Sequence, residues 1–240
     1  MVLVTHELLK SNLTQRILSA LFLAGITIVS LFHGSPLFEA LLFIVFMLLI
    51  FELKRLPFKG QGSFFVALYL IISFLSVYWL FYTNPGLILF LFCIVWSSDI
   101  GGYCAGKFFG GPKALSKVSP NKTWAGVLGA CFLTFFVITL FLDSPSLWPS
   151  GVFLYGEYFS PLDSWKLAKN VHFYLIPLPL VLSLTFSLLS QIGDFLESYI
   201  KRRLSIKDTG SLIPGHGGLF DRLDGLIFVA PIFALVINYL

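Results

Sequence analysis

The 240-residue chain is 57% hydrophobic and only 12% charged, whereas soluble domains usually carry about 25% charged residues. Its formal net charge of +4 is small and no nucleic-acid-binding pattern accompanies it, so nucleic acid is not an expected partner. The composition predicts an all-α, polytopic integral membrane protein, a single membrane domain over residues 1–240 that is embedded in the lipid bilayer.

Seven apolar segments are long enough, or nearly so, to cross a bilayer as helices, which takes about 20 residues each. They cover residues 17–32, 36–51, 64–82, 86–105, 125–142, 171–192 and 219–240. The second is short and contains Glu39, which we expect near an interface or facing protein. We therefore predict about seven transmembrane helices, with N-terminal helices in 1–96 and the catalytic motifs in 97–225.

Basic residues fall on every second connection between these segments. Of the 16 lysines and arginines, only Lys166 and Lys169 lie in the long connection 143–170, and the other connections of that side carry none. Because positively charged loops stay in the cytoplasm, this pattern places the N-terminus and the charged connections inside the cell. We expect the cytoplasmic (inner) membrane of a bacterium, with an active site on the cytoplasmic face.

The fourth segment runs into the polar stretch "SSDIGGYCAGKFFGGPKALSKVSPNKTWAG". Asp99 lies near the end of this apolar helix, where an ionisable side chain indicates function; the alternative is an interfacial aspartate satisfied by Ser97 and Ser98. The run "GGYCAGK" nearly matches a P-loop, but phenylalanine replaces the metal-binding hydroxyl residue and no strand precedes it. We reject the P-loop, and the glycines are typical of close helix packing.

Four lysines crowd the connection between the fourth and fifth segments, Lys107, Lys113, Lys117 and Lys122. Charge that keeps this loop in the cytoplasm would explain their sign. Lys122, however, lies with Ser119 and Thr123 at the start of the next helix, where free N–H groups favour an anion. The pattern alone leaves both interpretations open.

The sixth segment continues into a charged stretch. If residues 192–204 are helical, one broad face carries Asp194, Glu197, Ser198, Lys201 and Arg202. The alternative is a solvated amphipathic helix with charged pairs one turn apart.

The stretch "IPGHGGLFDRLDG" precedes the last apolar segment. Its glycines let the backbone adopt positive φ or approach a ligand closely. Asp221 and Asp224 then fall three residues apart on the first turn of the last helix. Carboxylates beside lysine and arginine suit a hard cation and the phosphates that it bridges. This chemistry predicts magnesium-dependent handling of a phosphorylated substrate at the cytoplasmic face.

The 27 residues from Ser198 to Asp224, which contain "SYIKR", "KDTG" and "IPGHGGLFDRLD", resemble the signature of the phosphatidate cytidylyltransferases, the CDP-diacylglycerol synthases. The upstream "QIGDFLES" and "SDIGGYCAGKFFG…SPNKTWAG" resemble the same family in the same order. The resemblance implies the reaction of CTP with phosphatidic acid to give CDP-diacylglycerol and pyrophosphate in phospholipid biosynthesis. It also implies Mg²⁺, with a monovalent cation such as K⁺ beside it. One departure is Ala125, where the family often carries Glu or Gln.

The resemblance assigns Asp194 and Asp221 to the metal, with Asp224 near it. With these three aspartates, Lys201 and Lys207 complete the expected catalytic set. His216 is expected either to bind pyrophosphate or to hold the glycine loop. The residues expected to bind substrate are Asp99, Lys107, Ser119, Lys122, Thr123, Arg202, His216, Gly217, Gly218 and Arg222.

Two other function classes were weighed against this one. A transporter would carry charges near the bilayer midplane in two related halves, whereas here they gather at one face and no matching halves are visible. A related prenol or lipid nucleotidyltransferase, or a CTP-dependent lipid kinase, stays open because a lipid tail leaves little trace in a sequence. A homodimer also stays open.

Overall fold

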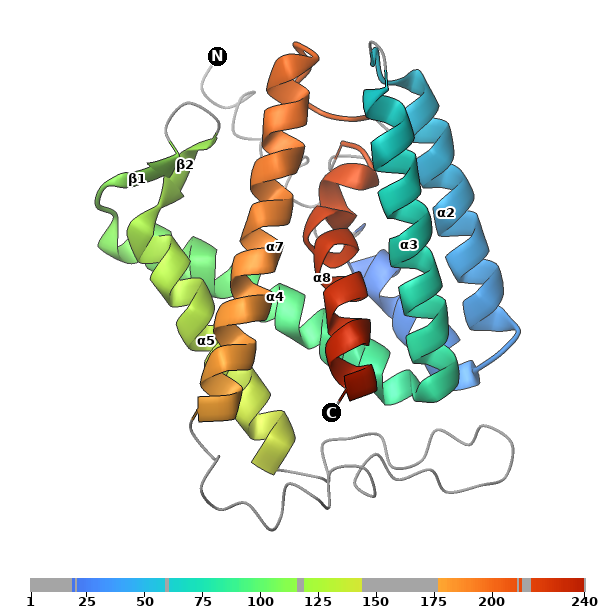
Figure 1. Cartoon of the computed structure of the whole chain (residues 1–240), viewed down its shortest axis with the longest axis horizontal. Coiled ribbons are helices and arrows are strands. Elements are labelled where there is room, and N and C mark those ends of the chain that lie inside the picture. Colours follow the sequence, from blue (N-terminus) through green and yellow to red (C-terminus); the bar gives the residue numbers. More distant parts are fainter. Residues whose placement is uncertain are drawn as a thin grey trace, which may run out of the picture.

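The computed structural model describes residues 19, 21–58, 61–115, 119–143, 177–210, 212 and 217–239. These residues form a bundle of helices with one small two-stranded sheet, which confirms the all-α prediction (Figure 1). Most of the long connection 143–170 and His216 lie outside the described residues, so the predictions made for them are not addressed.

Each of the seven predicted segments contains one helix of the bundle. The helices are Leu21–His33, α2 (Leu37–Arg55), α3 (Gly62–Thr83), α4 (Pro85–Phe109), α5 (Trp124–Asp143), α7 (Pro177–Arg203) and α8 (Phe220–Tyr239). Within the part of the chain that the structure covers, α3, α4, α5 and α7 are long and apolar enough to cross a membrane. The membrane class therefore holds, and the full count of seven spans stays a prediction.

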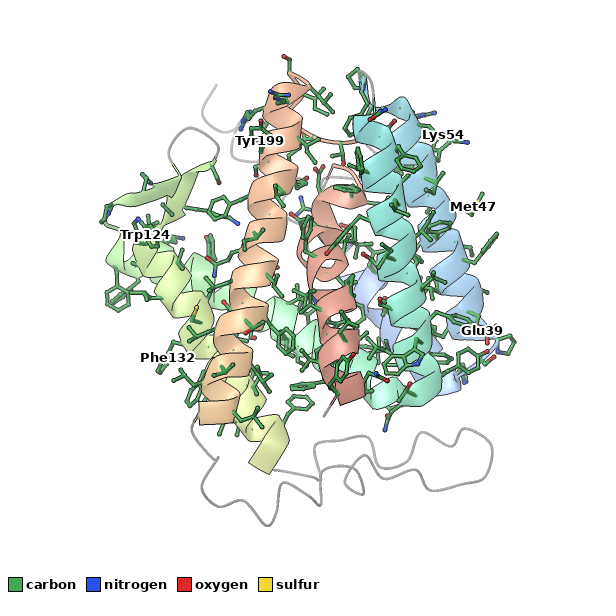
Figure 2. All side chains as sticks on the ribbon, in the orientation of Figure 1. Glu39, Met47, Lys54, Trp124, Phe132 and Tyr199 are labelled. Carbon is green, nitrogen blue, oxygen red and sulfur yellow. The ribbon has the colours of Figure 1, made fainter. Side chains whose placement is uncertain are left out.

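The core lies where α4, α7 and α8 meet. Phe186 of α7 and Phe233 of α8 are fully buried, with ring centroids 5.4 Å apart in an edge-on arrangement. Large apolar side chains on the outside, such as Phe132 of α5, point away from the bundle (Figure 2). Apolar surface on the perimeter is what a lipid solvent favours, since the tails are as apolar as the side chains.

Helices α4 and α5 pack backbone to backbone through glycines. A Cβ added to Gly129 would lie 2.7 Å from the carbonyl oxygen of Gly101, and one on Gly126 would lie 2.8 Å from the carbonyl oxygen of Gly102. Real side chains do not tolerate such distances, so glycine is what permits the approach. The interpretation as a packing residue is confirmed for Gly101, where a Cβ would overlap the carbonyl oxygen of Gly129, whereas a Cβ on Gly102 would make only ordinary contact.

A two-stranded antiparallel ribbon, β1 (Lys113–Leu115) and β2 (Ser119–Thr123), connects α4 to α5. The sequence pattern does not predict this ribbon. The ribbon leads directly into α5, where the Thr123 hydroxyl accepts a hydrogen bond of 3.1 Å from the Gly126 N–H and so caps the helix. Lys122, the neighbour of this cap, lies at the mouth of the helix as predicted.

The charged segments gather at one end of the bundle. The C-terminal ends of α2 and α7, the start of α8 and the ribbon all lie toward the upper side of Figure 1. Along α2, Lys54 lies at this end and Glu39 at the opposite one, while Tyr199 marks the same upper end of α7 (Figure 2). The described charged ends of α2, α7 and α8 therefore share one end of the bundle.

Candidate active site

A cavity of about 450 Å³ lies between the C-terminal half of α4, the start of α5 and the middle of α7. Five of the predicted site residues come together in its lining although they are far apart in the sequence. These five are Asp99, Lys107, Lys122, Thr123 and Asp194. The cavity joins the lysine-rich connection to the charged face of α7, two stretches that are separate in the sequence.

Lys122 connects the two sides of this cavity. Its ammonium forms an ion pair with the carboxylate of Asp194 and lies 4.7 Å from the ring centroid of Phe195. The Lys122 side chain is 31% exposed. The ammonium therefore remains within reach of an anion that enters the cavity, which favours the anion-binding interpretation of this lysine.

Asp99 lies close enough to the Lys122–Asp194 pair to interact with both charges. The serines beside it are engaged elsewhere: the Ser97 hydroxyl donates to the carbonyl of Ile94, and that of Ser98 lies 3.3 Å from the Ser187 hydroxyl. The alternative in which Ser97 and Ser98 satisfy Asp99 is therefore wrong. Asp99 belongs electrostatically to the cavity.

Helices α7 and α8 approach closely at two glycines. A Cβ on Gly193 would lie 2.9 Å from the carbonyl oxygen of Asp224, and one on Gly225 would lie 2.7 Å from the Ser190 hydroxyl. This approach brings the carboxyl groups of Asp194 and Asp224 into direct interaction. Like charges this close raise each other's free energy unless a cation or a proton compensates them.

One helical turn away, Glu197 of α7 faces Asp221 of α8. Lys201 lies between them, with its Nζ atom 2.8 Å from Glu197 Oε1 and 3.0 Å from Asp221 Oδ1. Because α7 and α8 run antiparallel, the pair Asp194–Asp224 and the pair Glu197–Asp221 lie one helical turn apart along the contact between the two helices. Glu197 was not among the predicted site residues, although its position three residues after Asp194 and four before Lys201 could have indicated it.

Backbone groups on either side of the glycine-rich stretch hold Asp221. Its carboxylate accepts hydrogen bonds from the backbone N–H groups of Thr209, at 3.1 Å, and Gly218, at 3.0 Å. Gly217 adopts a φ of 87°, which glycine reaches without strain. Together with Lys201, these donors hold Asp221 in one orientation, and its side chain is only 6% exposed.

Several predicted residues lie apart from the cavity. Arg202 and Lys207 are exposed, and the structure does not place them in its lining. Ser119 lies at the far end of β2, opposite Leu115, and is likewise not among the described lining residues. Arg222 contributes to a second cavity of about 450 Å³, which is lined almost wholly by apolar side chains of the N-terminal helices and α8.

The carboxylates suit a hard cation, although the described residues contain no group of three or more His, Cys, Asp or Glu side chains arranged for a metal. Mg²⁺ commonly uses one or two carboxylates and completes its shell with water and substrate phosphates. Asp194 with Asp224, and Asp221 next to them, offer such oxygen donors. The two residues predicted to bind the metal, Asp194 and Asp221, belong to neighbouring acidic pairs one helical turn apart. Each of their carboxylates contacts a lysine.

A model of the cytidylyltransferase family matches residues 58–240, about three quarters of the chain. The chain belongs to this family. It is 33% identical to a phosphatidate cytidylyltransferase of Rickettsia bellii over 230 residues, which covers 95% of this chain and 91% of the relative. The corresponding Rickettsia felis protein is 30% identical, with 95% and 93% covered.

A Brucella suis phosphatidate cytidylyltransferase is 37% identical over 148 residues, 62% of this chain and 45% of the relative. These similarities confirm the family resemblance seen in the signature, and the family makes the protein a nucleotidyltransferase. One buried carboxylate that contacts the glycine loop, Glu52 of α2, lies before the matched region and was missed from the sequence. No spacing or motif distinguishes it there from charged residues at a membrane edge.

Proposed function

We propose that the protein transfers the cytidylyl group of CTP to phosphatidate, forming CDP-diacylglycerol and pyrophosphate at a membrane surface. The observation that carries the proposal is the cavity in which Lys122 of the ribbon meets Asp194 of α7 at the charged end of membrane helices. The family match and the similarity to phosphatidate cytidylyltransferases supply the nucleotide and the lipid.

The reaction is proposed to be an in-line displacement. An anionic oxygen of the phosphatidate phosphate attacks the α-phosphorus of CTP, the bond from that phosphorus to the oxygen bridging to the β-phosphate breaks, and pyrophosphate leaves. Because the attacking oxygen is already anionic near neutral pH, no strong general base is needed. The barrier lies in bringing two polyanions together, so positioning and charge neutralisation are the main demands on the protein.

The lysines of the site meet that demand from two sides. Lys122, and Lys107 in the lining of the same cavity, offer ammonium groups to phosphates inside the cavity. Lys201 is fixed between Glu197 and Asp221, so it presents its charge from α7 in a defined direction. Exposed Arg202 and Lys207 at the same end would attract anionic substrates from solution.

We propose that Asp194 and Asp221, with Asp224 beside them, would hold Mg²⁺. Bound there, the ion would neutralise phosphate charge and favour departure of pyrophosphate. The support is the chemistry of the donors, oxygen ligands in closely spaced pairs. A monovalent cation such as K⁺ near the same site, and a homodimer, are further predictions.

The charged end of the bundle is proposed to face the cytoplasm of a bacterial cell, with seven spans and the N-terminus inside. Lys54 and the basic last turn of α7 lie at this end, which supports the orientation because basic segments are retained in the cytoplasm. A reporter fused after Leu240 is expected to read periplasmic. A cytoplasmic reading would contradict the odd number of spans.

The substrates can be tested with purified protein, radiolabelled CTP and a panel of acceptors: phosphatidate, diacylglycerol, a prenol and a prenyl phosphate. We expect a labelled nucleotide–lipid and pyrophosphate with phosphatidate only. Transfer to a prenyl phosphate would show that the acceptor is a prenyl phosphate rather than phosphatidate. Release of CDP with phosphorylation of an acceptor would indicate a lipid kinase. Absence of any lipid product would overturn the enzymatic proposal and favour a transporter.

A further inference from the structure

Glu52 of α2 is a buried carboxylate in contact with the segments that hold Asp221. It is 2% exposed and lies near the charged end of the bundle. Its Oε1 atom accepts a 2.6 Å hydrogen bond from the Thr209 hydroxyl, and its Oε2 atom accepts bonds of 2.9 and 3.1 Å from the N–H groups of Leu219 and Phe220.

The negative charge of Glu52 is matched to this position. No lysine, arginine or histidine of the described chain forms an ion pair with it, and a buried carboxylate without compensation is costly. The compensation comes from the N-terminus of α8, whose first N–H groups and helix dipole favour an anion. Glu52 therefore acts as a cap for α8 that is supplied by another helix.

Two short connections lead from Glu52 to Asp221. Thr209 bonds Glu52 through its hydroxyl and Asp221 through its backbone N–H. Phe220, which donates its N–H to Glu52, directly precedes Asp221 in the chain. The position of the Asp221 carboxylate thus depends on Glu52 in two ways, once through Thr209 and once through Phe220.

Gly210 and Gly218, which flank the centre of the glycine-rich stretch, are packed against this carboxylate. A Cβ on Gly218 would overlap Glu52 Oε1 and the Thr209 hydroxyl, and a Cβ on Gly210 would lie 3.0 Å from the Glu52 Cδ atom while overlapping Oε1. Position 217 requires glycine because its φ is positive, whereas the φ of Gly218 is not positive. Residue 218 is therefore glycine because Glu52 and Thr209 occupy the space.

We propose that Glu52 is a positioning residue for the nucleotidyl transfer: it fixes residues 209–210 and the segment 218–220 that begins α8, and thereby orients Asp221. This role rests on the proposed function described above. Glu52 lies outside the family match, which begins at residue 58, and outside the signature motifs. It would give the N-terminal helices a part in the reaction.

The first test replaces Glu52 with glutamine, which keeps the shape but cannot accept hydrogen bonds at its amide nitrogen. In Glu52→Gln we expect kcat for CDP-diacylglycerol formation to fall by about 100-fold, because a small displacement of a catalytic group has that effect. The KM for CTP should change far less. The control is Glu39→Gln, which alters a carboxylate at the opposite end of the same helix (Figure 2) and should keep wild-type kcat.

A double-mutant cycle tests the route through Thr209. Thr209→Val removes the hydroxyl that binds Glu52 but keeps the N–H that binds Asp221. If the two residues act through one contact, the double variant should lose no more kcat than the more impaired single variant. Losses that multiply, or wild-type kcat in Glu52→Gln, would overturn the proposal. Should Glu52→Gln fail to fold in detergent, wild-type kcat in Thr209→Val would overturn it alone.

A readout without turnover separates this proposal from the proposed function. Trypsin cleavage after exposed Lys207 should be faster in Glu52→Gln than in wild type or Glu39→Gln, because the loop loses its buried anchor. Unchanged cleavage together with unchanged kcat contradicts the positioning role. A wild-type protein that makes no CDP-diacylglycerol contradicts the proposed function instead, and equal cleavage in all three proteins would then overturn the loop-holding role of Glu52.

Discussion

Two parts of the site, the contact between α7 and α8 at Asp221 and the ribbon side of the cavity, are held in different ways. On the α7–α8 side, Asp221 is nearly buried and accepts hydrogen bonds from Lys201, Thr209 and Gly218. On the ribbon side, Lys122 is about one-third exposed and has one ion pair, to Asp194. The fixed side is suited to setting geometry, and the exposed lysine is suited to meeting a substrate whose position changes during the reaction.

This difference also separates two kinds of charge. A buried carboxylate with several donors has a single orientation, and removing its charge leaves those donors unpaired. An exposed ammonium keeps much of its hydration and loses less when it is replaced. Substitutions on the fixed side should therefore affect kcat most, and substitutions at the exposed charges should mainly affect substrate binding.

The largest effect is expected from Asp221→Asn. The substitution keeps the side-chain shape but removes the charge that faces Lys201 and the two backbone donors. We expect kcat to fall by on the order of 10³-fold, the upper range seen when one preorganised electrostatic contact is lost. Formation of CDP-diacylglycerol is the measurement, and thermal unfolding in detergent checks the fold.

Asp208→Asn provides a matched control, since Asp208 is an exposed aspartate of the same loop. It should keep wild-type turnover. If Asp221→Asn were folded and retained near-normal kcat, neither a metal nor a positioning role for Asp221 could stand, and the contrast between the two sides would disappear.

Lys122→Ala is expected to have an intermediate effect. The variant loses the ammonium in the cavity and leaves Asp194 without its partner. A hydrogen bond to a charged group contributes about 1.5–3 kcal/mol, which corresponds to a loss of roughly 10- to 100-fold in kcat/KM, mostly through KM for a phosphate-bearing substrate. Lys122→Arg should recover part of the loss because the charge is restored.

The control for Lys122 is Lys54→Ala, which removes an exposed lysine from the same end of the bundle (Figure 2). Steady-state kinetics with CTP and phosphatidate varied separately would show which KM changes. A loss confined to kcat would instead place Lys122 with the fixed geometry of the α7–α8 side.

Local pattern predicted much of this arrangement. Apolar stretches indicated the seven helices, and the expected start of the last one placed Asp221 correctly on the first turn of α8, whereas Asp224 lies just after that turn. The ribbon was missed because its pairing of Lys113 with Thr123 follows from the path of the chain rather than from alternating apolar residues. Asp194 lies beside Asp224 because of the register in which the antiparallel helices α7 and α8 pack. A sequence motif does not encode that packing register.

Glu52 shows where prediction from sequence stops. Its hydrogen-bond partner Thr209 is 157 residues away, and in the sequence a glutamate before Lys54 and Arg55 looks like any charged residue at a membrane edge. Only the packing of α2 against the start of α8 reveals that this carboxylate is buried. The residues of the signature could be predicted, whereas the support from outside the signature could not.

The smallest effect is expected at Lys207, which the signature assigned to catalysis but the structure leaves exposed and outside the cavity lining. Exposed charges typically contribute below about 1 kcal/mol and are screened by salt. Lys207→Ala should therefore raise the KM for CTP by at most about fivefold at low ionic strength, and the difference should vanish at high salt. A salt-independent loss as large as that of Asp221→Asn would show that Lys207 contacts the reacting phosphates, and the glycine loop would then belong to the adaptable side as well as the fixed one.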